Sequence, residues 1–102
     1  MYQMYLDKNG KPITREEWSA LFGNMAYKRI AHDPIPGGHL STVWLGLNHA
    51  VGEGPPLIFE SLTFWSGEEV MQRYSTLEEA AAGHAELLER LHKPPTGWTE
   101  PL

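Results

Sequence analysis

Residues 41–65 read STVWLGLNHAVGEGPPLIFESLTFW, and residues 75–92 read STLEEAAAGHAELLERLH. The first stretch places alternating side chains on either side of a loop rich in glycine and proline, which predicts antiparallel strands over 41–48 and 57–65. The second stretch repeats apolar residues at helical spacing, which predicts a capped helix over 77–91. Together the two patterns predict a helix packed on a sheet.

Two ionisable residues interrupt these apolar patterns. Glu60 shares a strand face with aliphatic residues, and His84 is the polar member of the helical stripe. If the loop 49–56 closes symmetrically, Leu45 lies opposite Glu60, and a helix covering this aliphatic face buries both ionisable groups. A one-residue bulge would reverse the face. We therefore predict that His84 is buried with Glu60 as its hydrogen-bond partner, as a structural pair or as a site whose environment tunes both groups.

The rest of the chain completes a single domain. Thr14 and Glu17 form a capping-box pattern that predicts a helix over 15–22. Residues 27–32 alternate weakly and predict a further strand. The predicted fold class is α+β, with an antiparallel three- to four-stranded sheet, a central hairpin and a C-terminal helix packed on one face. The domain is expected to span 1–93, followed by a C-terminal tail over 94–102.

Composition narrows the classes of function. A net charge of −5 over 102 residues argues against general DNA or RNA binding, which needs a basic face. Without cysteine there is no disulfide and no thiolate metal site. No 18-residue apolar run and no secretory signal are present, so we expect no membrane contact and a cytoplasmic location. No His-x-x-x-His spacing occurs and the chain has no cysteine, so neither a metal nor a cofactor is predicted.

Several short segments carry a resemblance to a known group of proteins. They are STVWLGLNH at 41–49, GPPLIFE at 54–60, RYST at 73–76 and the pair Gly83-His84, joined by DKNGKPITREEW at 7–18. This pattern resembles a family of short proteins from bacteriophage and prophage genomes. Phage accessory proteins of this size include counter-defence factors, such as the anti-Thoeris and anti-CBASS sponges that capture host immune nucleotides. The resemblance therefore implies a cyclic nucleotide or an ADP-ribose derivative as ligand, inside a bacterial host cell.

Under this hypothesis the candidate ligand-binding residues lie near the hairpin ends and the helix start. They are Trp44, Asn48, His49, Phe59, Arg73 and Tyr74. Aromatic rings can stack on a base, and an arginine can form charge-assisted hydrogen bonds with a phosphate. The structural alternatives are core packing for the aromatic residues, an exposed turn for His49 and an ion pair at the helix entry for Arg73.

Two other functions remain open. A metal-independent phosphodiesterase could use His49, Glu60 and His84 as catalytic acid–base groups, if all reach the scissile bond. A protein-directed inhibitor would instead dock its acidic surface on a host defence effector. In each case Trp44, Phe59 and Trp65 are expected on a sheet face that the helix leaves uncovered, which predicts a homo-oligomer.

Overall fold

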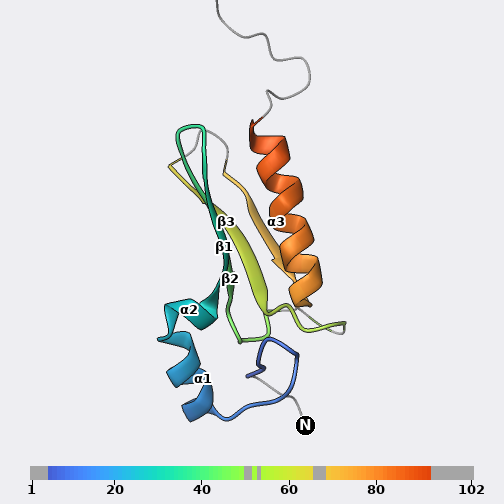
Figure 1. Cartoon of the computed structure of the whole chain (residues 1–102). Helices are drawn as coiled ribbons and strands as arrows, with labels where there is room; N and C mark the ends of the chain where they lie inside the picture. The colour runs from blue at the N-terminus through green and yellow to red at the C-terminus, as the bar shows by residue number, and fades with distance from the viewer. Residues whose placement is uncertain (1–4, 50–51, 53, 66–68, 93–102) are drawn as a thin grey trace, which may run out of the picture.

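The computed structural model of the protein describes residues 5–49, 52, 54–65 and 69–92 (Figure 1). Its elements, in chain order, are α1 (Arg15–Phe22), α2 (Met25–Lys28), β1 (Arg29–Ile35), β2 (Gly38–Trp44), β3 (Phe59–Phe64), β4 (Met71–Tyr74) and α3 (Leu77–His92). The four strands form one antiparallel sheet in the order β1-β2-β3-β4, and α3 packs against it. The predicted α+β class is confirmed. The predicted tail over 94–102 lies outside the described residues.

Local sequence signals set the helix boundaries. The hydroxyl of Thr14 accepts from the Glu17 N–H, and the Glu17 carboxylate accepts from the Thr14 N–H, so the predicted capping box and helix α1 are confirmed. The same exchange between Thr76 and Glu79 begins α3. In the described part of the chain, no helix has both the length and the apolar character that crossing a bilayer requires.

The predicted strand over 27–32 is wrong at its start and at its end. Asn24 caps a short helix through its side-chain oxygen, so residues 25–28 are helical. The strand begins at Arg29 and continues through Pro34 to Ile35. Because β1 lies at the edge of the sheet, a proline there can be accommodated without removing a hydrogen bond to a neighbouring strand.

The predicted pairing of the central strands is confirmed, with different limits and register. β2 ends at Trp44, and Gly46 then takes a φ of 74°, which a continuing strand does not allow. Val43 pairs with Glu60, where Leu45 was predicted. This shift of two residues keeps each side chain on its predicted face, because side chains alternate with a period of two.

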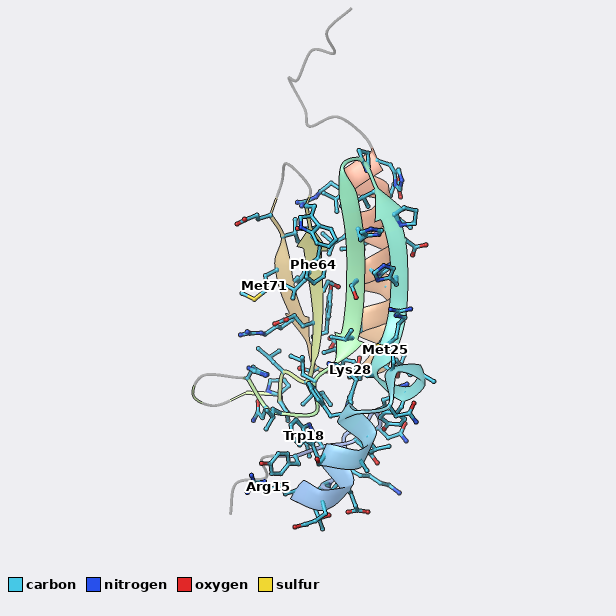
Figure 2. All side chains as sticks on the ribbon, turned by 90° about the vertical axis from the view of Figure 1, so that its left-hand side faces the viewer. Arg15, Trp18, Met25, Lys28, Phe64 and Met71 are labelled. Atoms are coloured by element: carbon cyan, nitrogen blue, oxygen red, sulfur yellow. The ribbon has the colours of Figure 1, made fainter. Side chains whose placement is uncertain are left out.

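The predicted face for the C-terminal helix is wrong. α3 covers the side that carries Trp44 and Phe59, both 0% exposed. Gly83 explains the close fit: a Cβ at this position would overlap the Tyr74 ring, so only glycine lets the helix approach this closely. The opposite side, here called the open face, carries His32, His39, Ser41, Val43, Glu60, Leu62, Phe64, Met71 and Arg73. Figure 2 looks onto this face, with α3 behind the sheet.

Candidate functional site

His84 occupies the centre of the interface between α3 and the sheet. It is 4% exposed, so its predicted burial is confirmed. Its Nδ1 lies 2.7 Å from the Thr42 hydroxyl and its Nε2 lies 2.7 Å from a carboxylate oxygen of Asp33. The prediction that Glu60 is the partner of His84 is wrong, because Glu60 lies on the open face and α3 covers the other side.

The contacts of His84 belong to a longer polar chain, defined as Asp33–His84–Thr42–Ser61–Tyr74. The Thr42 and Ser61 hydroxyl oxygens lie 2.5 Å apart, and the Ser61 hydroxyl lies 3.0 Å from the Tyr74 hydroxyl. The hydrogen bonds of this polar chain can all run toward a carboxylate at Asp33: Tyr74 donates to Ser61, Ser61 to Thr42, Thr42 to the His84 Nδ1, and the His84 Nε2–H to Asp33. Every buried polar group in the polar chain then has a hydrogen-bond partner. The polar chain has one member on each of the four strands and one on α3, so it links the whole sheet to the helix.

An acid, a histidine and a hydroxyl in sequence also occur where a hydrolase activates its nucleophile. Here Thr42 and Ser61 are both 0% exposed. A substrate therefore has no route to either hydroxyl oxygen. The geometry favours a structural role for the polar chain, in which buried polar groups fix the register of the sheet under α3.

Glu60 pairs across the open face with Arg73. The two residues are register partners, and the Arg73 Nε donates to a Glu60 carboxylate oxygen at 2.9 Å. The Glu60 side chain is largely buried and that of Arg73 is partly exposed. Arg73 therefore forms an ion pair between strands, and its charge is already engaged.

The other predicted site residues do not gather into one pocket. Trp44 packs on the rings of Phe22 and Tyr27, and Phe59 is as deeply buried, so neither offers a free ring to a ligand. Tyr74 is also buried in the same core cluster.

Asn48 and His49 lie at the base of the hairpin loop. The Asn48 side-chain oxygen accepts from the Leu57 N–H, and the His49 N–H donates to the Leu57 carbonyl. Glu60 and His84 lie on opposite sides of the sheet. The predicted catalytic set of His49, Glu60 and His84 is therefore not assembled.

The structure instead shows a groove of about 300 Å³ on the open face. Its lining residues are Met25, Lys28, Arg29, His32, Ser41, Val43, Leu45, Glu60, Leu62 and Phe64. Apolar side chains contribute most of its exposed lining, and α2 borders one end, as Figure 2 shows for Met25 and Lys28. Sequence reasoning missed this site, although Lys28-Arg29 is the one place where two of the eight basic residues are adjacent.

Aromatic rings continue the open face beyond the groove. The rings of His32 and His39 stack with centroids 5.2 Å apart, and Trp65 packs edge-on against His39 at 6.1 Å. Trp65 is 83% exposed with a φ of 58°, so its predicted place beside Trp44 and Phe59 is wrong. Within the described ranges, the Nδ1 of His39 is a buried polar atom with no hydrogen-bond partner. Such an atom commonly marks a place for a water or a ligand.

Comparison of the chain with family models, with curated proteins and with solved structures found no match. Among the residues that the structure describes, no three His, Asp or Glu side chains gather as a metal-binding set. The site is therefore interpreted from its own chemistry.

The ion pair on the open face gives a stability prediction. Arg73→Ala leaves the Glu60 carboxylate largely buried without its partner, and we expect the free energy of unfolding to fall by about 1.5–3 kcal/mol. Glu60→Gln in the same background should recover part of the loss, because the unpaired charge is gone. Urea denaturation measures both changes, with Arg15→Ala on the exposed side of α1 as the control. Equal, small effects of Arg73→Ala and Arg15→Ala would contradict the pairing.

Proposed function

We propose that this protein captures a small anionic ligand with a planar apolar part, of the nucleotide class, in the groove on the open face. The proposal rests on one observation: Lys28 and Arg29 border a mainly apolar groove in a chain whose net charge is −5. Apolar walls with a few charged groups are typical of small-molecule sites. A groove of about 300 Å³ lies at the lower end of the size range of such sites.

The distribution of charge supports an anion on this face. Glu60 is the acidic residue among those lining the groove, and its ion pair with Arg73 offsets its charge. Many of the other acids lie on helices: Glu16, Glu17, Glu78, Glu79, Glu86 and Glu89. The open face is therefore locally cationic in an acidic protein, and the stacked His32 and His39 rings beside it can contact a base.

The resemblance to phage proteins suggests the biological ligand. On this proposal the protein sequesters a host immune signal, a cyclic nucleotide or an ADP-ribose derivative, in the bacterial cytoplasm. The hydrolase alternative loses support, because its three proposed acid–base groups do not converge on one point.

A homo-oligomer belongs to the same proposal, on a different face from the one first expected. Phe64 and Met71 are exposed on the open face, and Met25 is exposed at its end (Figure 2). A second copy packed sheet to sheet would cover these side chains and enclose the ligand between subunits. Since Glu60 is already paired with Arg73, this contact would not leave the Glu60 carboxylate buried without a partner.

The test is incubation with a panel of cyclic nucleotides and ADP-ribose derivatives, followed by filtration and chromatography of bound and released ligand. We expect one ligand to bind and to be released unchanged. Arg29→Ala should weaken binding about tenfold by removing a charge-assisted contact, whereas Arg15→Ala on α1 should have no effect. Turnover that survives a chelator would support the phosphodiesterase instead.

A protein-directed inhibitor is the second candidate. The exposed Phe64, Trp65 and Met71 favour it, because large apolar side chains grouped on one face are typical of interaction surfaces. It replaces the first proposal if no nucleotide binds and the protein co-purifies with a host effector.

A further inference from the structure

β4 forms one edge of the sheet, and within the described residues no strand lies beyond it. The Thr63 N–H donates to the Val70 carbonyl, which marks these two residues as a hydrogen-bonded pair. Hydrogen-bonded and non-hydrogen-bonded pairs alternate along an antiparallel ladder. The N–H and C=O groups of Met71 and Arg73 therefore point outward, away from β3. An edge of this kind is a template for another strand.

A groove of about 390 Å³ runs beside this edge, between β4 and α3. Gln72, Tyr74 and Ser75 line one side, and Glu79, Gly83 and Glu86 line the other. Glu79 also holds the helix start through one carboxylate oxygen, whereas Glu86 is exposed on the body of α3. Arg73 borders the groove as well, but its guanidinium Nε binds Glu60 on the open face. The charge along α3 in this groove is therefore negative.

We propose that the outer edge of β4 binds an extended basic peptide segment as a fifth strand, with alternate Lys or Arg side chains lying in the groove against Glu79 and Glu86. Main-chain hydrogen bonds to an edge strand supply affinity, and pockets for every second side chain supply specificity. The alternation of side chains along the added strand matches a groove that runs along one side of β4. This surface is separate from the proposed nucleotide groove and extends the function to a protein partner.

Charge excludes a second copy of this chain as the favoured occupant. If two β4 edges paired antiparallel, about a twofold axis perpendicular to the sheet, both α3 helices would lie on the same side of the joined sheet. Glu79 and Glu86 of one copy would then face the same carboxylates of the other. Like charges that meet across an interface oppose association, whereas a basic segment neutralises them.

The test uses the whole protein and a fluorescein-labelled peptide of alternating Lys and Thr, eight residues long. We expect saturable binding by fluorescence anisotropy that weakens with salt, together with amide chemical-shift changes at Met71 and Arg73 in NMR spectra. A Glu–Thr peptide of the same length should not bind. A Lys–Thr peptide with N-methyl groups on alternate backbone nitrogens should bind at least about tenfold more weakly, since it lacks the donors that a strand needs.

Two charge reversals localise the contact. Glu86→Arg should weaken binding of the Lys–Thr peptide about tenfold, whereas Glu16→Arg, an equal change in charge on α1, should leave it within about twofold. The proposal is overturned if the peptide fails to bind the parent protein, if Glu86→Arg binds as tightly as the parent, or if the shifts fall at Lys28, Arg29 and Val43 in the open-face groove and not along β4. A negative result in this peptide test would not contradict nucleotide capture at Lys28 and Arg29, because the two proposed grooves lie on opposite sides of the sheet.

Discussion

Trp44→Ala should lower the free energy of unfolding by about 3–5 kcal/mol, the range for removing a large aromatic side chain from a core. Trp44 is fully buried in the main core cluster, where it contacts the rings of Phe22 and Tyr27. Its indole N–H also donates to the Leu6 carbonyl at 3.0 Å, which ties the N-terminal segment to β2. A domain of this size is stabilised by only about 5–15 kcal/mol, so this single change removes a large part of its stability.

Thermal and urea denaturation measure the effect. Each kcal/mol corresponds to about 4–8 °C in Tm for a domain of this size, so Tm should fall by at least about 12 °C. Trp65→Ala is the matched control, because it deletes the same side chain from a position that is 83% exposed. We expect a change within about 0.5 kcal/mol there. Similar losses for the two variants would show that Trp44 does not occupy the core.

The contrast between these two tryptophans shows what the sequence can predict. Alternation correctly grouped Trp44 with Phe59 on one face, because a period of two depends only on neighbouring residues. It could not say which side α3 covers, since both faces of the hairpin are rich in apolar residues. That choice depends on tertiary fit, above all on Gly83 admitting the ring of Tyr74. Trp65 follows the strand pattern but leaves it through a positive φ that local sequence did not indicate.

The candidate site shows the same limit. The burial of His84 could be predicted from its place in the apolar stripe of α3, but its partner could not. Asp33 lies 51 residues away on β1, and its contact with His84 depends on a strand whose limits were predicted wrongly. The open-face groove was missed for a similar reason, because Lys28 and Arg29 reach it only through the short helix α2.

His84→Ala should cost about 2–4 kcal/mol, the second large effect. The change leaves a cavity under α3 and removes the ring nitrogen to which the Thr42 hydroxyl donates, and Thr42 is fully buried without access to solvent. It also removes the hydrogen bond to Asp33. His32→Ala is the matched control, because His32 is exposed on the open face and should change stability little.

A pair of double-mutant cycles then distinguishes the two possible partners of His84. Thr42→Val removes the hydroxyl that His84 binds, so His84→Ala should cost less in that background, with a coupling of at least about 1 kcal/mol. Glu60→Gln lies across the sheet, and its effect should add to that of His84→Ala within about 0.5 kcal/mol. Strong coupling to Glu60 without coupling to Thr42 would place α3 on the aliphatic face. The expected result instead assigns His84 to the polar chain, whose hydroxyls hold β2, β3 and β4 in register beneath the helix.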